Sequence, residues 1–548
     1  MTGWLRVNGL SVTDVNPRTA TAHGTAAQMA TTFGTQLENY RIGTATYHAQ
    51  TTTVTAPAAV APDILTVNGL DNLPAKAGKP GTAKDVATAG ATKASAPKAV
   101  ATKAVPAKPG TTATPPANPC PAYLGQTPAT DLPAAYGRPV QWAPCGYTPQ
   151  AVRDAYGVTG TGLNGKGVTV GIIGVSYETK AMADADRFSA EHGEPQFAPG
   201  QFTAYVPDNA GTSPSGGEFT MDIEAAHAMA PAADIAYVVA PGNHDGHPVL
   251  DAMTRIVDEH LADVVSGSVL LGKGLPGLTA GSIAPYEQAF QQAAVEGITV
   301  NFASGDSGSE SYDGALHVAY PAASPWVTAV GGTTLATGPG NQYAWETGWA
   351  TDAATLSDDG TQWTPAPPGD PSGASGGGNS SGFTQPGYQR GIVPPVMAGS
   401  TPARTVPDVA ALADPSLGLL YGHTAVDIKG NLAYTTENGG GTSLSSPLFA
   451  GVEALIVQAH HGPIGFANPA LYARYRAGDF RPILDNPAST PDTKSFATVE
   501  QAVVGGGTWV QLTTPGQYAD SDLTFGPGYN LVTGLGSPTR GLIDSFRF

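Results

Sequence analysis

The sequence lacks any long apolar run: none approaches the ~18 residues that a membrane-spanning helix needs. It also has very little cysteine, since Cys120 and Cys145 are the only two among 548 residues. A disulfide between them would close a small loop and stabilise the fold by about 3 kcal/mol. We favour this disulfide because other features below indicate export; in the cytosol the two would be separate thiols. The sequence therefore indicates a protein that does not cross a membrane.

Basic residues are also scarce: 26 Lys and Arg stand against 44 Asp and Glu, which gives a net charge of −18. Seven of the twelve lysines fall between residues 72 and 118, so from residue 119 onward 16 basic residues face 39 acidic ones. An acidic surface does not suit nucleic acid, whose phosphates need basic partners. It would lose most of its self-repulsion in acid, although acidic residues also serve ordinary solubility.

Composition divides the chain into regions. Residues 72–118 are almost all Ala, Lys, Pro, Thr and Gly, so they cannot bury a core and are expected to form a disordered, easily cleaved linker. After the linker, strand and helix patterns alternate, which predicts an α/β fold with a parallel sheet covered by helices on both faces. The expected strands are 167–175, 234–239, 264–265 and 298–303, and the expected helices are 182–192, 249–261 and 286–296.

A glycine-rich turn before an apolar stretch indicates a nucleophile. Residues 439–447 read Gly-Gly-Gly-Thr-Ser-Leu-Ser-Ser-Pro, and apolar residues follow at helical spacing. Glycines let the chain bend sharply just before the helix. Ser443 would then stand in the first helical turn, where the positive end of the helix can hold a developing oxyanion.

A serine hydroxyl needs a base, and a pair of acids provides one. After the loop 214–217, residues 218–230 read as a helix that Pro231 ends. Glu218 and Asp222 are four apart and share one face of it. Two carboxyl groups this close should raise one pKa, whereas the helix N-terminus should lower that of Glu218. Such a base could work in acid, where an imidazole would already be protonated.

A further acid follows a predicted strand. Asp306 lies in the Ser304-Gly305-Asp306-Ser307-Gly308 loop after strand 298–303. The carboxyl ends of parallel strands are where sites are built. A carboxylic acid that keeps its proton can donate a hydrogen bond to an oxyanion, and we assign that role to Asp306.

The chain resembles the sedolisin family, the serine-carboxyl peptidases, and within it the kumamolisin-like and actinomycete members. The matching segments span residues 119–548: Glu218-x-x-x-Asp222, Ser304 to Gly308, Ser324 to Thr333, Pro407 to Ala410, the turn at Ser443, and Gly528 to Pro538. The resemblance implies a subtilisin-like sheet and protein or peptide substrates. It makes Ser443 the nucleophile, Glu218 its base and later acid, Asp222 the residue that orients Glu218, and Asp306 the oxyanion acid.

Residues 1–71 resemble part of a sedolisin propeptide, which implies an α+β, ferredoxin-like activation domain that is incomplete here. The start of the chain has no apolar signal core. We expect a secreted monomer whose signal and early propeptide precede this chain, and whose own propeptide acts as inhibitor and chaperone until the linker 72–118 is cut.

The chain also departs from the family pattern. A family calcium site near the C-terminus would use Ile483, Gly526, Gly528 and Asn530, but Pro482 and Asn530 stand where aspartates are expected. Because Ca²⁺ favours anionic oxygens, we expect this site to be weak or lost unless Asp485, Asp520 or Asp522 substitutes. Gly174 stands where kumamolisins extend the pair with an acid, and Ser266 to Val269 replaces a stretch that often contains tryptophan.

Several alternatives remain open at this stage. Within the family, the chain is either an endopeptidase or a tripeptidyl exopeptidase. Outside it, the fold could serve as a catalytically silent binding scaffold. A neutral-pH serine hydrolase would need a histidine such as His227 or His423, but His227 falls about 180° round the helix from Glu218. The His-Gly-Thr-His segment of subtilisin-like enzymes does not follow Asp306.

Overall fold

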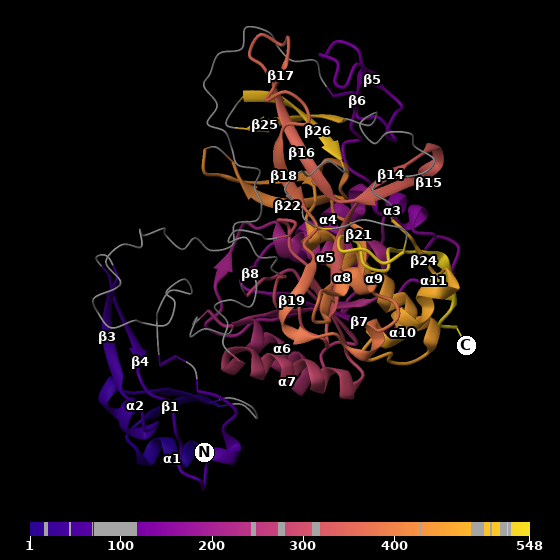
Figure 1. Ribbon diagram of the computed structural model, residues 1–548. Coiled ribbons are helices and arrows are strands. Elements are labelled where there is room, and N and C mark those ends of the chain that lie inside the picture. The colour runs from indigo at the N-terminus through magenta and orange to yellow at the C-terminus, as the bar shows by residue number, and fades with distance from the viewer. Residues whose placement is uncertain are drawn as a thin grey trace.

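The computed structural model describes residues 1–15, 20–42, 45–67, 69–70, 118–242, 248–271, 280–309, 318–427, 429–483, 498–504, 507–515, 523 and 528–547. The expected linker at 72–118 therefore lies outside the described residues except for Asn118. Residues before it form a lobe of their own (Figure 1). Its elements are α1 (Thr2–Val7), β1 (Ser11–Val15), β2 (Ala20–His23), α2 (Ala26–Thr32), β3 (Leu37–Ile42) and β4 (Ala45–Gln50), with antiparallel β1–β2 and β3–β4 pairs.

The larger lobe is built on an eight-stranded sheet. Its order is β15-β14-β13-β12-β7-β11-β9, with β21 also paired to β14, and every pairing except β14–β15 is parallel. This sheet confirms the α/β prediction. The strands are β7 (Thr169–Gly174), β9 (Phe202–Tyr205), β11 (Asp234–Val239), β12 (Val264–Gly267), β13 (Thr299–Ala303), β14 (Thr328–Thr337), β15 (Tyr343–Gly348) and β21 (Val409–Leu412).

Helices cover both faces of this sheet (Figure 1). On β11, Tyr237 and Val239 join one buried cluster, and Ala236 and Val238 join the other. Alternate residues of a strand point to opposite faces, so a strand buried on both sides is apolar throughout. The first cluster includes α3 (Pro149–Ala155), α4 (Ala181–Glu191), α5 (Glu218–Met229) and α9 (Thr442–His460), and the second includes α6 (Pro248–Asp258) and α7 (Ala280–Glu296).

The helix α7 begins earlier than the sequence indicated. We expected it from residue 286, directly after Pro285, but the structure places Pro285 inside it. A proline in the second turn removes one N–H donor, so only the carbonyl four residues before it loses its helical partner. Packing of the rest of α7 on the sheet compensates for this loss.

A second sheet and several short pairs complete the lobe. The second sheet has seven strands in the order β17-β16-β26-β25-β6-β5, with β18 beside β16. Cys120 and Cys145 are joined by a disulfide close to its first strands. The remaining elements are β5 (Pro128–Ala129), β6 (Val140–Trp142), β8 (Tyr177–Glu178), β10 (Thr212–Ser213), β16 (Ala350–Leu356), β17 (Trp363–Thr364), β18 (Asp370–Ala374), β19 (Gly378–Thr384), α8 (Pro395–Ala398), β20 (Ala403–Val406), β22 (Leu420–Val426), β23 (Leu432–Asn438), α10 (Asn468–Arg474), β24 (Phe480–Arg481), β25 (Thr498–Val504), β26 (Gly507–Pro515), β27 (Ser537–Pro538) and α11 (Arg540–Asp544), together with short 3-10 turns.

A buried ion pair explains the Pro407 to Ala410 segment. Asp408 and Arg404 are fully buried, and two hydrogen bonds of 2.6 and 2.5 Å join them. Asp408 also accepts hydrogen bonds from the hydroxyl of Tyr472 and the backbone N–H of Ala329. A buried ion pair persists only when its remaining hydrogen-bonding capacity is satisfied in this way.

Within the described part of the chain, no helix is both long and apolar enough to cross a membrane.

Candidate active site

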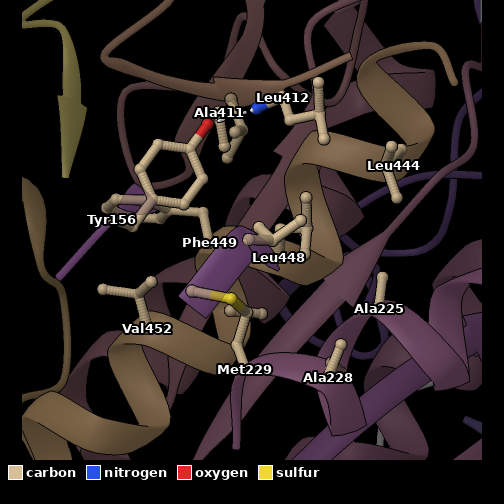
Figure 2. Close-up of a cluster of buried hydrophobic side chains, with 14 of the residues drawn as sticks. Tyr156, Ala225, Ala228, Met229, Ala411, Leu412, Leu444, Leu448, Phe449 and Val452 are labelled. Atoms are coloured by element: carbon tan, nitrogen blue, oxygen red, sulfur yellow. Dashed lines mark hydrogen bonds between the residues drawn. The ribbon is translucent and has the colours of Figure 1, made fainter. Parts of the chain in front are cut away.

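Two helices that are far apart in the sequence lie side by side and carry the site. In Figure 2, Ala225, Ala228 and Met229 of α5 face Leu444, Leu448 and Phe449 of α9. The approach is close because residue 451 is glycine: a Cβ there would lie 2.6 Å from the Cβ of Met229 and 3.0 Å from the carbonyl oxygen of Ala226. This packing brings the first turns of α5 and α9 together.

Ser443 is the second residue of α9 and is partly exposed. Its side chain lies beside Glu218 and lowers the pKa of that carboxyl. The turn before it needs glycine, because Gly441 has φ +80° and a Cβ there would lie 2.9 Å from Asp306 Oδ2. The structure therefore brings together the serine and the first acid that the sequence indicated.

Burial dominates the protonation of the acid pair on α5. It raises the pKa of Glu218 to about 7; the hydrogen bond from Ser443 lowers that pKa, and the charges of Asp306 and Glu178 raise it. Asp222 is fully buried, and burial together with the charge of Glu218 raises its pKa well above the usual range. From the sequence we expected only one of these two pKa values to rise, but both rise. The lowering of the Glu218 pKa that we expected from the helix N-terminus is outweighed by burial.

The acid pair has unsatisfied acceptor atoms. Glu218 Oε1 and Asp222 Oδ2 are buried, and neither has a donor among the described residues. Both oxygens are acceptors when ionised. One proton held by Asp222 would supply the missing donor and leave Glu218 as the member that ionises.

Asp306 is anchored to the residue before the nucleophile. It follows β13 and is partly exposed. Its Oδ1 accepts hydrogen bonds from the backbone N–H of Thr442 at 2.7 Å and from the Thr442 hydroxyl at 2.9 Å. The backbone N–H of Gly305 donates in turn to the Thr442 hydroxyl at 3.0 Å. These bonds hold the Asp306 carboxyl beside the first turn of α9.

Sequence reasoning missed two side chains at this site. Ser268, just after β12, has its Oγ 2.9 Å from Asp222 Oδ1 and 3.1 Å from the carbonyl oxygen of Ser443, so it links the second acid to the nucleophile's backbone. Glu178 hydrogen-bonds to the N-terminus of α5. The stretch around Ser268 was noticed only as a departure from a family pattern, and no local motif marks Glu178.

The candidate histidines have other partners. His227 is buried, its Nε2 lies 2.7 Å from the carbonyl oxygen of Pro195, and burial lowers its pKa. His423 contacts the carbonyl oxygen of Gly216 and, at 3.0 Å, the carboxyl of Glu437. These contacts of both rings are thus with groups other than Ser443.

The described residues at the expected calcium site do not fit a cation. The Asn530 amide nitrogen donates to the carbonyl oxygen of Ile483 at 3.3 Å and to the Thr533 hydroxyl at 2.8 Å, while its oxygen accepts from the N–H groups of Val532 and Thr533. A cation cannot lie between a carbonyl oxygen and an N–H that already binds it. Gly528 is described and has φ +100°, whereas Gly526 and the possible substitutes Asp485, Asp520 and Asp522 lie outside the described residues. Groups of three or more His, Cys, Asp or Glu able to hold a metal are absent from the part of the chain the structure covers.

We therefore propose that no calcium ion is needed here and expect EGTA to leave the melting temperature and activity unchanged. A calcium ion present at a free concentration ~100 times its dissociation constant would add about 2.7 kcal/mol to the free energy of unfolding. Its removal would then lower the melting temperature by several degrees. Asn530→Asp is the matched variant: its carboxylate would face the Ile483 carbonyl oxygen, so added calcium should stabilise it. A drop in melting temperature of the unmodified protein on adding EGTA would contradict the proposal.

The fold and the site together define a class: a subtilisin-like α/β domain in which carboxyl groups, and not an imidazole, surround the serine. Comparison with known proteins agrees. Residues 204–476 match the model of the subtilase family, and residues 1–73 match that of the pro-kumamolisin activation domain. Together with the relatives below, these matches support the sedolisin family of serine-type peptidases and, within it, the kumamolisin-like members.

Individual relatives support this assignment. Kumamolisin from Bacillus sp. (strain MN-32) is 35% identical over 413 residues, which cover 72% of this chain and 62% of that protein. Tripeptidyl-peptidase 1 from Homo sapiens is 26% identical over 424 residues, which cover 72% of this chain and 63% of that protein. The chain thus spans less than two thirds of these relatives. Pseudomonas sedolisin, a serine-carboxyl proteinase, has the same fold, with a TM-score of 0.56 at 22% identity over 73% of this chain and 97% of that one.

Proposed function

We propose that this chain is a secreted, acid-active serine-carboxyl endopeptidase that hydrolyses protein and peptide substrates through an acyl-enzyme on Ser443. The observation that carries this proposal is that the Ser443 side chain lies beside Glu218 and lowers the pKa of that carboxyl, where the first turns of α5 and α9 meet. A serine becomes nucleophilic only when a base takes its proton, and Glu218 is the group in contact with it.

In the proposed reaction, Ser443 Oγ attacks the carbonyl carbon of the peptide bond while Glu218 takes its proton. Asp306, held beside the turn, donates a hydrogen bond to the carbonyl oxygen as negative charge develops there. Glu218 then gives the proton to the leaving amine, which departs and leaves an ester on Ser443. A water molecule attacks this ester with Glu218 again as base, and the serine and the acid product are released.

The proposed pH range follows from two opposite requirements. Glu218 must be ionised to act as a base, and its pKa of about 7 makes the ionised fraction fall tenfold for each pH unit below that value. Asp306 must keep its proton to act as a donor. We expect both conditions to be met together mainly on the acid side of neutrality, so that activity forms a bell there.

The N-terminal lobe is proposed to inhibit the enzyme until the 72–118 linker is cut. The match of residues 1–73 to an activation domain supports this role. Residues 72–118 are rich in Lys, Ala and Pro, a composition that predicts easy cleavage. We also propose that the mature enzyme acts as a monomer outside the cell, without nucleic acid or membrane partners.

The test is hydrolysis of an unfolded protein after acid treatment, measured from about pH 3 to about pH 8. We expect a bell with its maximum below neutrality and fragments produced by internal cleavage. A long peptide with an acetylated N-terminus separates the two family activities, because an endopeptidase cuts it and a tripeptidyl peptidase, which needs a free amino group, does not. Absence of turnover at every pH would support the silent scaffold and contradict the proposal.

A further inference from the structure

The helix α5 has no cap of its own. The residue before it is Gly217, which has no side chain to bind the free N–H groups of the first turn. Glu178, from β8, supplies the acceptor. Its Oε1 lies 3.2 Å from the N–H of Gly217 and 3.4 Å from that of Phe219, and its Oε2 lies 2.9 Å from the N–H of Thr220 and 2.8 Å from the Thr220 hydroxyl.

Glu178 is buried in this position, with 6% of its surface exposed. All four of these partners are donors, which is the environment of a carboxylate and not of a carboxylic acid. Gly216 makes room for it, because a Cβ at that residue would lie 2.1 Å from the Glu178 carboxyl carbon. The backbone N–H of Glu178 also donates to the Tyr237 hydroxyl at 3.3 Å, which fixes β8 against the central sheet.

This cap changes the electrostatics of the base. The positive end of a helix ordinarily favours an ionised acid in its first turn. Here Glu178 occupies those N–H groups, and its negative charge raises the pKa of both Glu218 and Asp222. The titratable groups that face or interact with it are Glu218 and Asp222 on α5, Tyr237 on β11, and Tyr421 and His423 on β22. His423 can offset this charge only in part, because it is paired with Glu437.

We propose that Glu178 is a positioning residue for the peptidase reaction: it fixes the first turn of α5 and, through its charge, sets the pH range in which Glu218 acts as base. The inference rests on the proposed function, since it concerns the protonation of the proposed base. It assigns the setting of that range to a side chain 40 residues before Glu218, on a strand with no recognisable motif.

The test is the acid limb of kcat/KM against pH. Glu178→Gln keeps an oxygen acceptor for Thr220 but removes the charge, so the limb should move to lower pH by about 0.5 to 1 unit. Gly216→Ala leaves the charge in the chain but pushes the carboxyl away from α5, so its limb should move in the same direction. Glu259→Gln removes an exposed acid of the same charge and should leave the limb in place.

A purely structural role gives a different result. In that case Glu178→Gln would lower kcat and the melting temperature while its limb stayed with that of the unmodified enzyme. The inference is overturned if the acid limbs of both variants coincide with that of the unmodified enzyme. If Glu178→Gln fails to fold, the acid limb of Gly216→Ala decides. Hydrolysis that survives in Ser443→Ala would refute the proposed function itself, whatever the limbs do, so the two failures are distinguishable.

Discussion

Ser443→Ala should reduce kcat by at least about 10³-fold, and Glu218→Gln should reduce it by a similar factor. The reason is that the hydroxyl and the carboxyl act as one unit: neither a serine without a base nor a base without a nucleophile forms the acyl-enzyme. The double variant should therefore lose no more than either single variant. Initial rates on an unfolded protein, at the pH of maximum activity, measure this.

The control for this experiment lies two residues along the same helix. Ser445 is buried, and its hydroxyl donates to the carbonyl oxygen of Thr442 within α9. Ser445→Ala should keep most of the activity, which would show that the loss at Ser443 is chemical. Melting temperatures near that of the unmodified protein would show that each variant folds. Full activity of either Ser443→Ala or Glu218→Gln would contradict the mechanism.

Stability should fall as pH rises from about 4.5 to about 8, which is the opposite of ordinary acid denaturation. Glu453 on α9 is fully buried, with Asn301 donating to one of its oxygens, and burial raises its pKa to about 8. Burial likewise raises the pKa of Glu287, and that of Glu218, to about 7.

The sign follows from which state releases protons first. An unfolded glutamic acid loses its proton near pH ~4.3, whereas these folded ones keep theirs up to about 7 or 8. Their stabilising effect is therefore complete below the unfolded pKa and is lost as pH rises through the folded pKa. For Glu453 the loss is on the order of 5 kcal/mol. Glu437 opposes this trend, because its hydrogen bond with His423 lowers its pKa and so its contribution disappears in strong acid.

Glu453→Gln is the variant that isolates this effect. The amide has the same shape and does not ionise, so it should match Glu453 near pH ~4 and be several kcal/mol more stable near pH ~8. Urea unfolding at both pH values, in a Ser443→Ala background that prevents self-digestion, measures the difference. Glu259→Gln serves as the exposed control. An equal effect of Glu453→Gln at both pH values would show that this residue does not titrate as described.

The protonation of the proposed base and the expected pH dependence of stability have one physical cause. The same desolvation that raises the pKa of Glu218 also raises those of Glu287 and Glu453. An enzyme with several such buried acids is most stable in the pH range where they hold their protons. Burial of carboxyl groups therefore favours the folded protein in acid, whereas for Glu218 it sets the lower pH limit at which the proposed base is ionised.

Several features of the site were predictable because they are local. The spacing of Glu218 and Asp222 places them on one face of any helix formed there. The glycines before Ser443 and the apolar spacing after it predict a turn and a helix start. The β-branched residues before Asp306 predict a strand whose end carries that acid. The βα alternation predicts the parallel sheet, because such crossovers pair parallel strands.

Other features depend on contacts between distant segments. The start of α7, the close approach that Gly451 permits, and the Ser268 hydroxyl between Asp222 and the nucleophile's carbonyl depend on the packed structure. The same holds for Asn530, whose amide nitrogen donates a hydrogen bond to the Ile483 carbonyl oxygen.

Short-range spacing along the chain is enough to predict the family resemblance, the parallel sheet and the residue types of the proposed catalytic set. The protonation of that set depends instead on how distant segments pack around it. A helix N-terminus in isolation would favour an ionised Glu218, but in the folded chain burial raises its pKa and Glu178 takes up the N–H groups that would have lowered it. Desolvation and charge act through space, so their balance is fixed only when the segments are packed together.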